Sequence, residues 1–112
     1  MTKFIPLSEP NLIAKEWDYV KKCLDDNWVS SSGKYLDRFE SQICKYTKSK
    51  YAVACVNGTS ALHISLLLAG VKSDHEVLVP SLAFISPVNA IHYCNAHPVF
   101  MDSDNFLNID LS

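Results

Sequence analysis

In the first part of the chain, apolar residues recur at the spacing of an amphipathic α-helix. After an extended arm that contains Pro6 and Pro10, apolar residues begin at Leu12 and recur at helical spacing until the acidic pair at 25–26. The residues that share this face are Ile13, Trp17, Val20 and Leu24. We therefore predict a surface helix over about 12–24.

A second amphipathic helix is predicted over about 34–48. Its opposite face is charged, as in a helix that packs one side on a core. The apolar positions are Leu36, Phe39, Ile43 and Tyr46. Residues 28–33, with the sequence WVSSSG, form a short loop between the two helices, and we expect its last serines to supply the N-cap of the second helix.

From Tyr51 onward the apolar residues form short continuous runs, which is typical of strands covered on both faces. Strands are predicted at 51–56, 76–79 and 98–101. Helices are predicted between them, at about 59–69 and 85–95. Strand, helix, strand, helix and strand in this order predict an α/β fold with a parallel sheet and right-handed crossover helices. The expected organisation is an arm with two helices at 1–50, followed by a βαβαβ unit at 51–112.

The composition suggests that this unit is truncated. Apolar residues make up 48% of the 112 residues and charged residues 20%, which is an apolar composition for a domain of this size. A three-stranded parallel sheet with open edges is also a poor end for a domain. We expect further chain or a partner to cover the excess apolar surface.

Charge and hydropathy exclude several classes of function. The net charge is −2 with no basic stripe, so we expect no nucleic-acid partner. No apolar run approaches the roughly 20 residues of a membrane-spanning helix, and no signal peptide is evident, which favours a cytoplasmic location without membrane attachment. The cysteines show no CxxC pair and are expected to be reduced and mostly buried. They are Cys23, Cys44, Cys55 and Cys94.

The turn at 57–60 is the strongest candidate for a binding site. A helix that begins after a buried strand leaves backbone N–H groups without partners, and these can bind an anion. Thr59 and Ser60 add hydroxyl groups beside Gly58. The turn lacks the lysine of a Walker loop and the further glycines of a dinucleotide motif, which favours the phosphate of a small cofactor. An ordinary tight turn with a threonine or serine cap remains the alternative.

Two further loops follow predicted strands and are expected at the same sheet edge as this turn. In the loop at 80–86, Phe84 either stacks on a planar ligand or packs in the core. Ser86 and Asn89 are candidate polar contacts, and Ser86 before Pro87 also fits a helix N-cap. In the loop at 102–105, Asp102 and Asp104 are expected to stabilise a turn or to cap a helix. His63 lies in an apolar helix and is expected to make a buried hydrogen bond rather than to bind a metal.

Five segments in this order resemble the N-terminal third of the DegT/DnrJ/EryC1/StrS family of sugar aminotransferases. The family uses pyridoxal 5′-phosphate (PLP) on an aspartate-aminotransferase-like fold, fold type I, so the chain is expected to form the N-terminal part of the large domain. The nearest likeness is to the branch of the family that acts on UDP- or GDP-linked amino-deoxy sugars for legionaminic acid and related surface glycans. The segments are Ile5–Pro10, Asn27–Gly33, Asn57–Leu62, Pro80–Phe84 and Pro98–Asp102.

The resemblance assigns roles to several residues of this chain. It implies that Gly58, Thr59 and Ser60 hold the cofactor phosphate and that Phe84 stacks on the pyridine ring. It further implies that the loop at 28–33 lies near the nucleotide sugar and the partner subunit of a homodimer. The expected substrate contacts are Trp28, Ser30, Ser31 and Asn89.

The reaction implied by the resemblance transfers an amino group from an amino acid, expected to be glutamate, to a nucleotide-linked keto-sugar for surface glycans. The lysine that forms the Schiff base with the cofactor, and the aspartate facing its ring nitrogen, match no residue of this chain. No catalytic residue and no metal ligand is therefore assigned, and the chain alone is expected to be inactive. The alternative is a non-catalytic phosphate- or sugar-nucleotide-binding module, or the product of a decayed gene.

Overall fold

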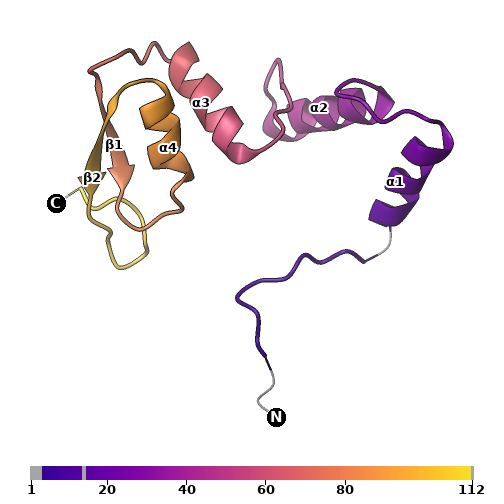
Figure 1. Ribbon diagram of the computed structural model, residues 1–112, viewed down its shortest axis with the longest axis horizontal. Coiled ribbons are helices and arrows are strands. Elements are labelled where there is room, and N and C mark those ends of the chain that lie inside the picture. The colour runs from indigo at the N-terminus through magenta and orange to yellow at the C-terminus, as the bar shows by residue number, and fades with distance from the viewer. Residues whose placement is uncertain (1–3, 14, 112) are drawn as a thin grey trace. The chain divides into compact units, whose positions relative to one another are not determined.

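The computed structural model describes residues 4–13 and 15–111 (Figure 1). These residues form two compact units, divided between Tyr51 and Ala52, which are described separately below. Within the described ranges, no helix is long and apolar enough to cross a membrane. The same ranges contain no cluster of three or more histidine, cysteine or acidic side chains suited to a metal ion.

The first unit contains helices α1 (Lys15–Asp25) and α2 (Lys34–Thr47). Helix α1 begins later than predicted: Leu12 and Ile13 precede it, and position 14 lies outside the described residues. Both side chains are about three-quarters exposed, so a helix there would bury little apolar surface. The predicted bounds of α2 are confirmed to within one residue.

The expected serine cap of α2 is wrong. Gly33 occupies the N-cap position, and no side chain forms a capping hydrogen bond. The reason is local, because the carbonyl of Ser32 is turned towards the indole of Trp28 and Gly33 has a φ of 142°, which favours glycine.

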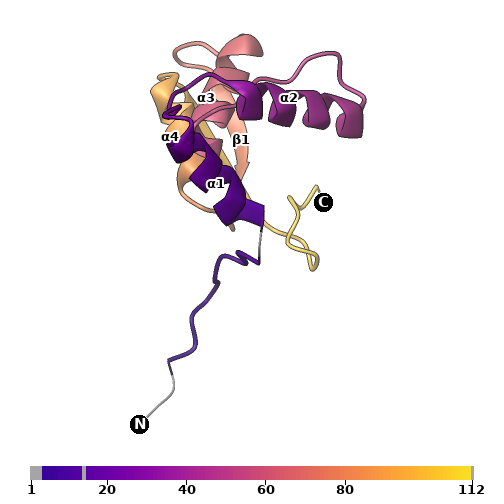
Figure 2. The same ribbon diagram turned by 90° about the vertical axis from the view of Figure 1, so that its right-hand side faces the viewer.

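The second unit contains α3 (Gly58–Leu68), β1 (Glu76–Pro80), α4 (Ser86–Tyr93) and β2 (His97–Met101). The two strands are parallel, with Glu76 opposite His97 and Pro80 opposite Met101. Helix α4 is the crossover between them, and α3 packs along α4. Figures 1 and 2 show α4 beside the strands and the chain after β2 continuing from the end of the sheet. The predicted α/β fold with parallel strands and a crossover helix is confirmed.

The strand predicted at 51–56 is not formed. Residues 51–55 have no regular secondary structure, and the described sheet pairs only β1 with β2. A strand exists only where a neighbouring strand accepts its hydrogen bonds, and a continuous apolar run does not supply that neighbour. Val53 and Val56, which the pattern placed in the core, are 82% and 90% exposed.

The core of the second unit is small and lies where α4 faces the sheet. Val79 of β1 and Ile91 of α4 are each 2% exposed. Cys94 and Ala96 complete this cluster, and Leu66, Val71, Val77 and Val88 pack around it. Cys94 is the only described cysteine that is buried, so the expectation of mostly buried thiols is wrong.

Each of the described helices is followed by a left-handed residue that redirects the chain. These residues are Asn27 after α1, Lys48 after α2, Gly70 after α3 and Asn95 after α4. After α1, α3 and α4, the N–H of the next residue donates back to the last turn of the helix, which completes a C-capping motif. At the end of α4, the N–H of Ala96 donates to the carbonyl of Ile91 at 3.2 Å, and both side chains are buried. The motif therefore satisfies the last carbonyls of the helix while adding an apolar contact to the core.

Candidate cofactor and substrate site

The predicted phosphate turn lies at the start of α3. Asn57 is the N-cap: its backbone is extended, and its side-chain Oδ1 accepts a hydrogen bond from the N–H of Ser60 at 2.8 Å. The carbonyl of Asn57 accepts from the N–H of Ala61 at 3.2 Å, which is the first bond of the helix. The helix therefore begins one residue earlier than predicted, and the cap is an asparagine rather than a threonine or serine.

This helix start has the donors that an anion requires. The N–H groups of Gly58 and Thr59 belong to the first turn, where no intrahelical carbonyl is available. The first turn carries no acidic residue, whereas α1 and α2 both do. A Cβ on Gly58 would meet no atom within 4 Å, so the backbone is open to a ligand on that side. Thr59 and Ser60 are half-buried. These residues fit the phosphate of PLP.

Phe84 lies in the loop between β1 and α4. Its side chain is 88% exposed, which excludes the alternative that it packs in the core. The loop begins at the carboxyl end of β1, where the N–H of Ser81 donates to the carbonyl of Met101 in β2 at 2.8 Å. The exposed ring of Phe84 is therefore available to a planar ligand.

The loop after β2 leaves from the same edge, because the strands are parallel. The aspartates expected to stabilise a turn there do so: Asp104 accepts from the N–H groups of Phe106 and Asn108, both at 2.8 Å. Two of the three expected loops are thus brought to one sheet edge. The third expected loop, at 57–60, follows no strand.

Helix α4 contributes Asn89, which is half-buried. Ser86 is the first residue of this helix rather than its cap, because Ile85 already has helical dihedral angles and accepts from the N–H of Asn89 at 3.0 Å. His63 of α3 is half-buried and meets Tyr93 of α4 edge to face, with ring centroids 5.5 Å apart. This contact replaces the buried hydrogen bond predicted for His63.

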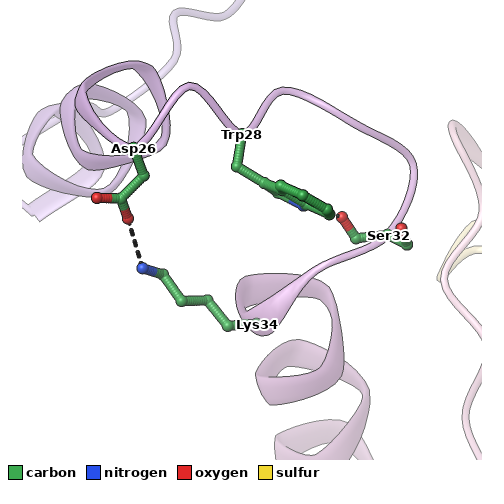
Figure 3. A network of polar contacts seen from close by, with 4 residues as sticks. All are labelled: Asp26, Trp28, Ser32 and Lys34. Carbon is green, nitrogen blue, oxygen red and sulfur yellow. Dashed lines mark hydrogen bonds and ion pairs between the residues drawn. The ribbon is translucent and has the colours of Figure 1, made fainter.

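In the first unit, the loop between α1 and α2 borders a cavity of about 390 Å³. Trp28 and Ser30 are among the residues that line it, and Ser31 is not. The indole N–H of Trp28 donates to the carbonyl of Ser32 at 2.6 Å (Figure 3). The Trp28 side chain is 58% exposed, so its ring remains open to a ligand although its donor is occupied.

An ion pair closes this loop at its base. The Lys34 ammonium donates to the Asp26 carboxylate at 2.6 Å (Figure 3). This hydrogen bond lowers the pKa of Asp26 and raises the pKa of Lys34. Both groups are solvent-exposed, so the pair contributes little to stability.

The structure thus places the expected site residues in two sets. Gly58, Thr59, Ser60, Phe84 and Asn89 belong to the second unit, and Trp28, Ser30 and Ser31 belong to the first. Sequence reasoning missed two residues that shape these sets, Asn57 and Gly33. The signals were present, because asparagine is a preferred N-cap and glycine is preferred at positive φ.

Known proteins with similar sequences belong to a single family. The sequence profile of the DegT/DnrJ/EryC1/StrS aminotransferase family matches residues 10–112. A GDP-perosamine synthase of Escherichia coli O157:H7 is 47% identical over 103 residues, which are 92% of this chain and 28% of that protein. A GDP-perosamine synthase of Caulobacter vibrioides is 43% identical over 100 residues, which are 89% of this chain and 27% of that protein.

Solved structures give the same fold. The putative sugar aminotransferase Spr1654 of Streptococcus pneumoniae, in its PLP form, matches 95% of this chain and 27% of its own with a TM-score of 0.83 and 26% identity. An aminotransferase of Psychrobacter cryohalolentis matches 88% of this chain and 26% of its own with a TM-score of 0.78 and 34% identity. The chain spans a little over a quarter of the length of its curated relatives. Its sequence and fold show that it belongs to the DegT/DnrJ/EryC1/StrS aminotransferase family.

Proposed function

We propose that this chain is the part of a PLP-dependent sugar-nucleotide aminotransferase that anchors the cofactor. The observation that carries the proposal is the start of α3, where first-turn N–H groups and two hydroxyls lie together without a carboxylate. In this proposal Gly58, Thr59 and Ser60 hold the phosphate, and Phe84 stacks on the ring. When bound, PLP supplies an electron-withdrawing ring that stabilises negative charge on the carbon bearing the amino group.

The proposed reaction exchanges an amino group for a carbonyl oxygen. Glutamate gives its amino group to a nucleotide-linked keto-sugar and leaves as 2-oxoglutarate. In the first unit, Ser30 and Ser31 are the proposed polar contacts to the sugar nucleotide, with Trp28 in the same loop. In the second unit, the proposed polar contact is Asn89. The relatives' names refer to a GDP-linked sugar, which favours GDP-linked keto-sugars over the UDP-linked ones as first substrates to test.

Other parts of the proposal concern the assembly and the limits of this chain. We place the active site in a cytoplasmic homodimer, in which the partner covers exposed apolar side chains. Residues 1–112 contain no lysine assigned to the Schiff base, so the 112-residue polypeptide alone should transfer no amino group. Amino transfer by that polypeptide alone would contradict this part of the proposal.

The cofactor site is tested by titrating PLP into the natural full-length polypeptide that contains residues 1–112. The Thr59→Ala/Ser60→Ala variant should bind PLP at least tenfold more weakly, because two hydroxyl donors to a charged phosphate are lost. Ser65→Ala is the matched control, since the Ser65 hydroxyl lies on the same helix and donates to the carbonyl of Ala61 at 2.8 Å. Equal affinity of the double variant and the wild type would refute the assignment.

A second candidate function is dehydration. The solved structure of a GDP-4-keto-6-deoxymannose-3-dehydratase matches 94% of this chain and 29% of its own with a TM-score of 0.77 and 27% identity. The identity to the perosamine synthases is higher, at 43–47%, which favours the aminotransferase. Incubation with GDP-4-keto-6-deoxymannose, glutamate and PLP distinguishes them, because only amino transfer places nitrogen on the recovered sugar. PLP binding without turnover of either kind would support the binding module.

A further inference from the structure

The indole of Trp28 is held by two features of its own loop. Its N–H donates to the carbonyl of Ser32 at 2.6 Å, across four residues (Figure 3). Its ring also lies directly against Gly33: a Cβ at that position would be 2.5 Å from the indole Nε1 and 2.9 Å from Cδ1. Gly33 has a φ of 142°, so both its backbone and its neighbour require glycine. Both contacts place the indole Nε1 against the peptide unit of Ser32 and Gly33 and fix the same side chain.

The ends of this loop are fixed as well. Asn27 has the left-handed conformation, and the N–H of Trp28 donates to the carbonyl of Cys23 at 2.8 Å, which ties the loop to the last turn of α1. At the other end, the carbonyl of Gly33 accepts from the N–H groups of Leu36 and Asp37 in α2. The segment 29–31 is therefore held at both ends by backbone hydrogen bonds to α1 and α2.

The serines within this span are not used to hold it. Among the described residues, the hydroxyls of Ser30 and Ser31 have no hydrogen-bond partner, whereas the Ser32 carbonyl and the Trp28 N–H do. The loop thus contains polar groups that fix its backbone and, at the exposed residues Ser30 and Ser31, hydroxyls that take no part in fixing it. Such a division is expected where hydroxyls must be presented to a ligand in one geometry.

We propose that Trp28 is a positioning residue, whose hydrogen bond to Ser32 and contact with Gly33 set the loop geometry in which Ser30 and Ser31 meet the substrate. The proposal deepens the proposed function and rests on it for the identity of the substrate, a nucleotide-linked keto-sugar. Trp28 acts through the loop and needs to donate no hydrogen bond to the sugar nucleotide. Gly33 is its counterpart, because any side chain there would displace the indole.

Trp28→Phe tests the hydrogen bond, because it removes the N–H and keeps an aromatic ring. The matched control is Trp17→Phe in α1, which removes an indole that is 68% exposed. Both variants are made in the natural full-length polypeptide, and kinetics are measured with GDP-4-keto-6-deoxymannose. Trp28→Phe should raise the KM for the sugar nucleotide about five- to tenfold, the size of one lost hydrogen bond, with kcat and the PLP Kd within twofold of wild type. Trp17→Phe should change neither.

A spectroscopic measurement tests the clamp without any turnover. In protein whose tryptophan indoles carry ¹⁵N, the indole N–H of Trp28 should exchange with solvent at least tenfold more slowly than the indole N–H of Trp17. In Gly33→Ala this protection should be lost, and the loop at 29–32 should be cleaved faster by protease. Equal exchange of the two indoles in the wild type, or identical KM values for Trp28→Phe and Trp17→Phe, would overturn the proposal. A wild type that protects Trp28 but uses no keto-sugar would instead contradict the proposed function.

Discussion

The substitution Asn57→Asp separates the structural role of the α3 cap from its role beside a bound phosphate. The Asn57 Oδ1 accepts a hydrogen bond from the N–H of Ser60 at 2.8 Å. An aspartate carboxylate can accept the same bond, and asparagine and aspartate are equally good N-caps. The substitution therefore keeps the cap and adds one negative charge to the helix start.

The added charge should raise or leave unchanged the stability of the helix, but it should weaken PLP binding. A carboxylate at a helix N-terminus stabilises the helix by about 0.3–1 kcal/mol, so the free energy of unfolding should stay constant or rise slightly. A phosphate bound by the same turn would lie within about 4–8 Å of the carboxylate, where two like charges repel by about 2–4 kcal/mol at an effective dielectric constant of 20. Asn57 is exposed, and solvent screening reduces this value. We expect PLP to bind at least tenfold more weakly.

Two measurements on the same sample check this expectation. Unfolding in urea gives the stability without PLP, and a spectroscopic titration gives the PLP Kd at low and high salt. Asn57→Ala is the companion variant: it loses the cap, should be about 0.5–2 kcal/mol less stable, and adds no charge. An unchanged PLP Kd in Asn57→Asp, at a stability equal to wild type, would refute the placement of the phosphate at this helix start.

Three other predictions concern the core, the stacking ring and the ion pair. Ile91→Ala should lower the free energy of unfolding in urea by about 2–5 kcal/mol, because Ile91 is 2% exposed. Phe84→Ala should weaken PLP binding in a titration without changing the Tm, and Phe84→Tyr should restore the affinity, since the ring is 88% exposed. The ion pair is tested with Asp26→Asn by measuring urea unfolding as a function of pH. The difference in the free energy of unfolding from wild type should be largest between pH 3.8, the ordinary pKa of Asp26, and pH 10.5, the ordinary pKa of Lys34. It should vanish as the pH falls through the lowered pKa of Asp26 or rises through the raised pKa of Lys34.

The elements that the sequence predicts well are those with a local signal. Helix α2 carries its own apolar face, and β1 and β2 are bounded by turn residues, so their positions are confirmed to within about one residue. The run at 51–56 has an equally strong apolar signal and no strand, because a strand depends on a partner elsewhere in the chain. A pattern of one segment cannot report whether that partner is present.

In the candidate site too, features with a local sequence signal could be predicted, and features that depend on contacts between neighbouring groups could not. The anion-binding start of α3 follows from a helix after a turn, and Phe84 follows from a loop after a strand, so both could be proposed from spacing. The roles of Asn57 and Gly33 depend on which side chain lies against which backbone group. The Asn57 side chain, rather than that of Thr59 or Ser60, caps α3. Before α2, the carbonyl of Ser32 accepts from the Trp28 indole, and no serine side chain caps the helix. Such competition between neighbouring groups is decided by geometry rather than by residue preference.

The two prolines of the sheet limit how other strands can join it. The N–H of His97 and the carbonyl of Met101 point towards β1. Backbone groups alternate in direction along a strand, so those of Pro98 and Phe100 point to the outer edge of β2. By the same alternation Pro80 faces the outer edge of β1. Each edge therefore lacks one N–H donor, and the outer edge of β2 retains only that of Phe100 between 97 and 101. A strand arriving beside β2 must donate to its carbonyls in the correct register, which protects the edge against indiscriminate pairing between chains.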